Sequence, residues 1–247
     1  MPNIFDLKLV FTEIPSLLKY LPITLEITLL SMIFGLALGL LLAVIKMKRI
    51  PVLYRASAVF VSFMRGTPII VQLYITYYGI PIFLKYVNYY NGTHYNVNNI
   101  SPMIFVLLAF TLNEAAYNSE SIRAALQSVD KGQLEAANSL GMSYPQVLRR
   151  IIVPEAFEVA LPTLGNSLIG MMKGTSLAFV CSVVEITAQG QIIAGYSYRF
   201  FEVYVSLSII YWALTILIEQ GIKRIEKKIS ISDVKIDNRG SELYDRN

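Results

Sequence analysis

The chain has 247 residues, of which 55% are hydrophobic and 15% are charged. Because soluble domains carry about 25% charged residues, this composition and a mean hydropathy of +0.53 predict an integral membrane protein. A single cysteine, Cys181, excludes an internal disulfide, and together with one histidine, His94, it gives no metal or redox signature. The net charge of +4 does not indicate nucleic-acid binding, since the basic residues cluster at the ends of apolar segments.

Residues 1–20 are predicted to form an amphipathic segment that lies at the membrane interface. Apolar and polar side chains are closely mixed in this stretch, which includes the acids Asp6 and Glu13. It has neither the basic n-region nor the small-residue cleavage site of a secretory signal peptide. We therefore expect it to stay part of the folded chain.

Five apolar segments are each long enough to cross a bilayer, whose core needs about 20 helical residues. They are residues 21–45, the part of 50–86 that follows Pro68, 101–125, 156–184 and 201–222. The amphipathic start of the second segment is expected to lie on the membrane surface before a bend at Arg65–Pro68. Residues 21–228 are thus predicted to form one transmembrane domain, followed by a polar cytoplasmic tail at 229–247.

Basic residues orient these segments, because cytoplasmic loops are enriched in Lys and Arg. Three clusters lie on one predicted side: Lys46, Lys48, Arg49 and Arg55; Arg123, Lys131, Arg149 and Arg150; and Lys223, Arg224, Lys227 and Lys228. The opposite loops, residues 85–100 and 185–199, carry only two Lys or Arg residues, Lys85 and Arg199. The predicted fold is an all-α membrane protein of five transmembrane helices, with its N-terminus outside and its C-terminus in the cytoplasm.

The polar passage at residues 133–154 predicts a pair of short cytoplasmic helices. Gln133–Leu140 has small helix-forming residues and is stopped by Gly141. Ser143 is a favourable N-cap for the second helix, with Pro145 in its first turn and Gln146 placed to complete a capping box. A kinked helix pair on a loop is a shape suited to docking into another protein.

Polar residues within the predicted spans are candidates for a substrate path, because ionisable groups inside a membrane are costly and usually functional. The third span contains Asn113 and Glu114, and the fourth contains Lys173, Thr175 and Ser176. Glu114 and Lys173 could either pair with each other, which would only stabilise the bundle, or line a wet cavity. Gly35 and Gly39 form a small-xxx-small pair that predicts close helix packing.

Arg65 stands beside the break Gly66-Thr67-Pro68, near the predicted cytoplasmic side. It is either a snorkelling anchor or a contact that holds a gate. The sequence contains no HExxH, no GxSxG and no Gly-rich phosphate loop followed by Lys and Ser or Thr. We therefore expect neither an enzyme nor ATP hydrolysis by this chain alone.

Several of these motifs together resemble a known family. Six loop residues resemble the EAA coupling motif of ABC-importer permeases, with Val153 where that family usually has Leu: Glu135, Ala136, Ala137, Gly141, Ile151 and Pro154. Three further motifs are Arg65–Pro68 followed by Gln72, Asn113–Tyr117 and Lys173–Leu177. Over residues 15–225 the chain is similar to the polar amino-acid uptake family of ABC permeases, which includes histidine, glutamine, arginine and cystine permeases.

The resemblance implies a bacterial plasma-membrane permease subunit that forms a homo- or heterodimer, with two ABC ATPase chains and an extracytoplasmic solute-binding protein as partners. It implies no cofactor and no metal. The loop residues around Glu135 would couple to the ATPase, and Gln72 would join the five polar residues of the substrate path. The sequence is compatible with cystine as the substrate but does not decide which amino acid is carried.

Two other classes of protein are alternatives to this interpretation. A channel or secondary transporter could use Glu114 and Lys173 without ATP, but it would not need the Glu135 loop, and no inverted repeat is evident. A membrane-embedded enzyme would need a nucleophile with a base or a metal cluster, and one His with one Cys argues against it.

Overall fold

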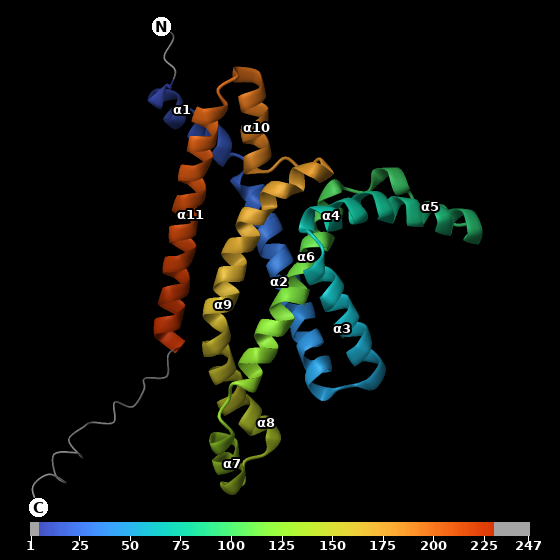
Figure 1. Ribbon diagram of the computed structural model, residues 1–247, viewed down its shortest axis with the longest axis vertical. Coiled ribbons are helices and arrows are strands. Elements are labelled where there is room, and N and C mark those ends of the chain that lie inside the picture. Colours follow the sequence, from blue (N-terminus) through green and yellow to red (C-terminus); the bar gives the residue numbers. More distant parts are fainter. Residues whose placement is uncertain (1–4, 230–247) are drawn as a thin grey trace, which may run out of the picture.

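The computed structural model describes residues 5–229, all of whose regular elements are helices (Figure 1). The α-helices are α1 (Leu7–Leu18), α2 (Leu21–Lys48), α3 (Pro51–Gly66), α4 (Ile69–Tyr74), α5 (Ile80–Asn91), α6 (Pro102–Gln127), α7 (Lys131–Ser139), α8 (Tyr144–Val147), α9 (Val153–Gly174), α10 (Ile186–Ser197) and α11 (Phe200–Ile229). Two π-helical segments, Ile75–Gly79 and Leu148–Ile152, and two 3₁₀ segments, Val97–Asn99 and Thr175–Cys181, lie between them. Most of the predicted tail, residues 230–247, lies outside the described residues.

The centre of the bundle is the contact between α2 and α6, as the small-residue pair predicts. A Cβ added at Gly35 would lie 2.7 Å from the Cβ of Glu114, and one added at Gly39 would lie 3.1 Å from the carbonyl oxygen of Ala115. No larger residue fits at Gly35 unless the helices separate. The two glycines therefore let α2 approach the face of α6 that carries Glu114.

The first helix, α1, packs against α11 at the end of the bundle opposite α7 and α8 (Figure 1). Asp6 caps it by accepting a hydrogen bond from the Lys8 N–H. Its buried residues Val10 and Leu17 face the bundle, and the hydroxyl of Ser206 in α11 donates to the Val10 carbonyl at 2.7 Å. Other apolar side chains of α1 are exposed, namely Leu7, Phe11 and Leu18. The interfacial position of residues 1–20 stays a prediction.

The expectation that residues 50–66 lie on the membrane surface is wrong. A break does occur at Thr67-Pro68, but α3 packs against α2 and α6. Val61 and Met64 of α3 are buried in a cluster with Leu42 of α2 and with Ala115 and Ala116 of α6. Part of the apolar surface of α3 is thus used for helix packing, while Val52, Val59 and Phe63 are exposed. After the break, residues 69–91 project sideways from the bundle (Figure 1).

By length and apolar character, three helices of the described chain could cross a membrane: Leu21–Lys48, Ile69–Asn91 and Phe200–Ile229. A fourth is possible if Tyr144–Cys181 and Ile186–Ser197, which meet at a bend of 57°, count as one span. Helix α6 is not among them, because its second half carries the polar stretch Asn113–Glu120. The described chain is thus an all-helical membrane-type bundle with three to four candidate spans.

Candidate functional site

The helical hairpin formed by α7 and α8 has the local structure that the sequence predicts. Helix α7 ends at Ser139, and Gly141, two residues further on, has a φ of +74°; a Cβ added there would meet no atom within 4 Å. The Gly141 N–H donates to the Asn138 carbonyl at 2.9 Å, and the Met142 N–H donates to the Ala137 carbonyl at 3.1 Å. Glycine is needed for its left-handed backbone, not to make room for a neighbour.

The second helix of the hairpin begins with the predicted capping box. The Ser143 N–H donates to Gln146 Oε1 at 2.8 Å. After one turn, α8 widens into the π-helical segment Leu148–Ile152, which leads directly into α9. Pro154 lies in the first turn of α9 and has no N–H to donate back into that segment. The hairpin is therefore joined to α9 by a short helical segment with no loop between them.

The six residues singled out from the sequence as the coupling motif differ in their exposure. Glu135 and Ala136 are exposed, whereas Ala137 is buried. Ile151 packs against a cluster that joins α6 to α9, formed by Ala125, Val129, Ala156 and Ala160. Two exposed residues that the sequence analysis missed lie at the turn: Leu140, 82% exposed, and Tyr144, 70% exposed. Their apolar character beside the predicted motif was a signal that could have identified them.

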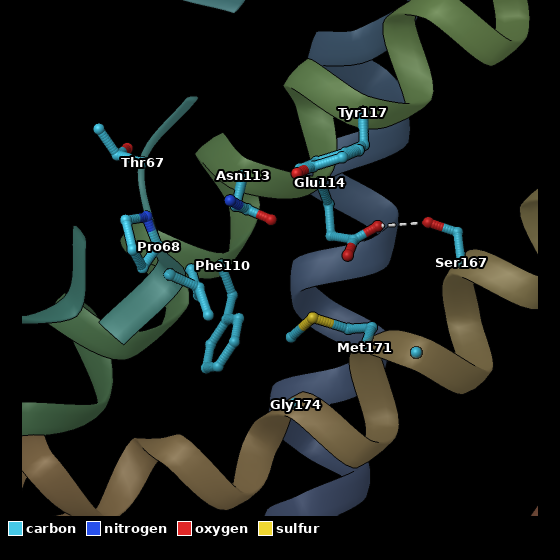
Figure 2. A pocket seen from close by; sticks show the side chains of 11 residues that line it. Thr67, Pro68, Phe110, Asn113, Glu114, Tyr117, Ser167, Met171 and Gly174 are labelled. Carbon is cyan, nitrogen blue, oxygen red and sulfur yellow. Dashed lines mark hydrogen bonds between the residues drawn. The ribbon is translucent and has the colours of Figure 1, made fainter. Parts of the chain in front are cut away.

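A cavity of about 380 Å³ lies between the α3–α4 break, α6 and α9. Figure 2 shows Glu114 and Asn113 of α6 facing Met171 of α9 and the break at Thr67-Pro68. The full lining is Thr67, Pro68, Ile69, Phe110, Asn113, Glu114, Tyr117, Ser167, Gly170, Met171 and Gly174. Gly170 borders this open space, with nothing within 4 Å of an added Cβ.

Glu114 is the acidic group of this cavity and is 8% exposed. Its Oε2 accepts hydrogen bonds from Ser167 Oγ at 2.7 Å and from Asn118 Nδ2 at 2.9 Å. Neither donor carries a charge, and no cation within the described chain forms an ion pair with Glu114. The alternative in which Glu114 and Lys173 pair with each other is therefore not what the structure shows.

Lys173 borders a different cavity of about 370 Å³, which Ser176 also lines. The other lining residues come from α10 and α11 and are Thr187, Tyr204, Leu207, Ser208 and Tyr211. Each residue turns a helix by about 100°, so Lys173 points away from the side on which Met171 lies. Thr175 lines neither cavity; it is buried and its hydroxyl donates to the Met172 carbonyl at 2.8 Å. The predicted path residues of the fourth span thus do not join Glu114.

Gln72 is buried at the break and does not line the cavity. Its Nε2 donates to the Met64 carbonyl at 2.8 Å and to the Thr67 hydroxyl at 2.9 Å. Its Oε1 accepts from Asn113 Nδ2 at 2.9 Å. Gln72 therefore ties the α3–α4 break to α6 and orients Asn113, which does line the cavity.

Arg65 is exposed and lies over an aromatic ring of α6. Its guanidinium carbon is 5.4 Å from the centroid of Tyr117, which lines the same cavity as Glu114. At this distance a cation–π contact is favourable. The structure thus places Arg65 against a cavity residue, a contact that snorkelling alone does not require.

A buried carboxylate, Glu185, was missed as a site residue by the sequence analysis. It caps α10 by accepting from the Ala188 N–H at 2.9 Å, and its other oxygen accepts from Thr24 and from the Tyr211 hydroxyl, both at 3.3 Å. It connects α2, α10 and α11. An acidic residue directly before a helix was the sequence signal for this cap. Within the described residues, no group of three or more His, Cys, Asp or Glu side chains could hold a metal.

Comparisons with known proteins agree on one family. Residues 35–231 match the family described as "Binding-protein-dependent transport system inner membrane component". The L-cystine transport system permease protein TcyL of Bacillus subtilis (strain 168) is 39% identical over 236 residues, which cover 96% of each chain. The probable amino-acid permease protein YxeN of the same organism is 41% identical over 215 residues, covering 87% of this chain and 92% of that protein.

A solved structure has the same fold. It is described as the crystal structure of an amino acid ABC transporter with histidines, and its chain is 32% identical with a TM-score of 0.77. The match covers 91% of this chain and 99% of that chain.

Proposed function

The chain belongs to the inner membrane components of binding-protein-dependent transport systems and is the permease subunit of an amino-acid ABC importer, not the ATPase, and we propose that its α7–α8 hairpin docks the ATPase. The observation that carries the proposal is the exposed pair Leu140 and Tyr144 at the turn where Gly141 has a φ of +74°. Exposed apolar side chains on a small projecting element are typical of an interaction site. Glu135 and Ala136 are exposed on the same hairpin, and we include them in the proposed docking element.

The hairpin connects the two helices that border the Glu114 cavity. Helix α6 carries Glu114 and leads into α7, while α9 carries Ser167 and Met171 and follows α8. Ser167 lies about 20 Å along α9 from Pro154 at a rise of about 1.5 Å per residue. A displacement of the hairpin by an ATPase that closes on ATP would therefore move both walls of the cavity as rigid rods.

We assign the Glu114 cavity to the substrate path. A free amino acid carries an ammonium and a carboxylate, so its path should present both signs of charge. Glu114 supplies the negative group, and Arg65 lies against the cavity residue Tyr117. Asn113 adds a neutral hydrogen-bonding group, held in place by Gln72. Lys173 and Ser176 border the second cavity and are proposed as a separate polar part of the path, with Thr175 buried behind them.

Five membrane crossings account for the distribution of basic residues along the chain and for the packing of the helices. We assign them to α2, to α3 with α4, to α6, to α9 and to α11. Helix α6 belongs to this set despite its polar half, because that half packs against α2 and faces the cavity. This places the N-terminus outside and the basic hairpin and the C-terminus in the cytoplasm, in agreement with the positive-inside rule.

The functional transporter requires other chains. The proposed assembly contains a second permease subunit, identical or homologous, two ABC ATPase subunits and an extracytoplasmic solute-binding protein. Cystine is the first candidate substrate, supported by the likeness to the cystine permease described above, and a polar or zwitterionic amino acid is the proposed class.

Co-purification of the ATPase tests the docking surface. Replacing Leu140 and Tyr144 together with Ser should weaken ATPase binding by more than tenfold, because buried aromatic anchors contribute about 2 kcal/mol or more to interfaces. Tyr89, which is also strongly exposed but lies on α5, provides the control as Tyr89→Ser. If the double variant retains the ATPase as well as this control does, the docking surface is assigned wrongly.

A further inference from the structure

A polar cavity lies where α2 turns into α3. Its volume is about 360 Å³, and its walls come from the last turns of α2 and α6 and the first half of α3. Its polar lining consists of Lys46, Arg49, Tyr54, Glu120, Arg123 and Gln127. The α2–α3 turn lies at the same end of the bundle as the α7–α8 hairpin (Figure 1). The cavity therefore opens near the membrane face to which the positive clusters point.

The cavity has an excess of positive charge. Glu120 is its single carboxylate and is shared by two cations: Lys46 Nζ contacts its Oε1, and Arg123 Nη2 lies 2.8 Å from its Oε2. Arg123 also donates to Gln127 Oε1 at 3.1 Å. One carboxylate cannot neutralise Lys46, Arg123 and Arg49 together. The lining is left with two uncompensated positive charges.

Two donors of the lining have no partner within the described chain. Arg49 follows the last turn of α2 with φ of +49°, and its guanidinium makes no hydrogen bond or ion pair there. The Tyr54 hydroxyl, in the first turn of α3, is likewise free within the residues described. A guanidinium, a hydroxyl and the remaining ammonium hydrogens of Lys46 around one space suit an anion with several acceptor oxygens, such as a phosphate group.

The surroundings of the cavity indicate where that phosphate comes from. The turn carries exposed apolar side chains, namely Met47, Ile50, Val52 and Leu53. A soluble phosphate would gain nothing from this apolar rim, whereas the acyl chains of a lipid would lie along it. Basic pockets between transmembrane helices on the cytoplasmic side can hold anionic headgroups. We propose that this cavity binds the phosphate of an anionic phospholipid headgroup and so fixes the α2–α3 turn to the inner leaflet.

Lipid titration of the full-length chain tests the proposal. The protein is placed in nanodiscs of phosphatidylcholine with increasing fractions of phosphatidylglycerol, and retained lipid is counted by native mass spectrometry. Arg49→Gln should weaken phosphatidylglycerol binding more than tenfold, because it removes charge-assisted hydrogen bonds to the phosphate that a residue outside the cavity does not make. Arg55→Gln is the matched control, because Arg55 is an exposed basic residue of α3 outside the cavity. It should bind as the wild type does.

A second variant covers the case in which Arg49→Gln does not fold. Tyr54→Phe keeps the aromatic ring, removes only the free hydroxyl and should also weaken phosphatidylglycerol binding. Equal losses in Arg49→Gln and Arg55→Gln would show unspecific attraction of charge and would overturn the proposal. Inorganic phosphate that binds with the same dependence on Arg49, without preference for phosphatidylglycerol over phosphatidylcholine, would also overturn it and assign the cavity to a soluble anion.

Discussion

A substitution at Gly141 is the most specific single-residue test of the α7–α8 hairpin. Its φ of +74° lies in the left-handed region, and an added Cβ would meet no atom within 4 Å. Gly141→Ala therefore introduces no clash and changes only the backbone energy, by about 1–2 kcal/mol. Asn tolerates the left-handed region better than Ala does, so Gly141→Asn should cost less.

The higher backbone energy destabilises the turn between α7 and α8. Two hydrogen bonds close that turn, from Gly141 to Asn138 at 2.9 Å and from Met142 to Ala137 at 3.1 Å. If Ala relaxes the turn, the population of the docking conformation falls by about fivefold to thirtyfold, the equivalent of about 1–2 kcal/mol. The spans themselves do not contact an added Cβ, so global stability should not change.

The assay is titration of the purified ATPase against the full-length permease, with thermal unfolding of the permease as a control. Affinity should fall in the order wild type, Gly141→Asn, Gly141→Ala, while the amount of inserted protein stays the same. Gly141→Asp should uncouple transport or detach the ATPase. Wild-type affinity in Gly141→Ala, or a weaker affinity in Gly141→Asn than in Gly141→Ala, would refute the reasoning.

Three further predictions concern the spans. Gly35→Ala should destabilise the permease by about 1–3 kcal/mol through overpacking against Glu114, seen as a lower melting temperature than that of Gly170→Ala, whose added Cβ has free space. Arg65→Lys keeps the charge but loses the flat guanidinium over Tyr117, so uptake should slow. Full activity of this variant would favour the interpretation of Arg65 as a snorkelling anchor. Glu114→Gln and Lys173→Met, each tested alone, should weaken uptake without reducing folded protein, and unchanged kinetics in both would remove them from the path.

Local signals in the sequence predicted the hairpin well, because caps and turns depend on neighbouring residues alone. Gly141 adopts the left-handed conformation, and Ser143 with Gln146 forms the capping box. The pair Gly35 and Gly39 also predicted a close helix contact, although the sequence did not identify α6 as its partner. The family followed from several such motifs together, and the comparisons confirm it.

The predictions that failed concern which face of a helix packs against which neighbouring helix. The apolar stripe of α3 fits lipid as well as it fits α2 and α6, so its burial with Leu42 was not predictable from periodicity. The sequence predicts a similar depth in the membrane for Glu114 and Lys173. The rotation of their helices, however, turns the two side chains toward separate cavities. The family resemblance assigned Gln72 to the substrate path, yet the backbone around Thr67 occupies its amide.

The central claim is that this permease moves an amino acid only when an ABC ATPase drives its hairpin. The most direct measurement is uptake of labelled cystine, and of competing amino acids, into proteoliposomes that contain the full-length chain, its ATPase and its binding protein. We predict uptake that requires ATP, stops with vanadate and is lost when Leu140 and Tyr144 are both replaced by Ser. Equal uptake in vesicles without the ATPase would contradict the claim and would indicate a channel or secondary transporter.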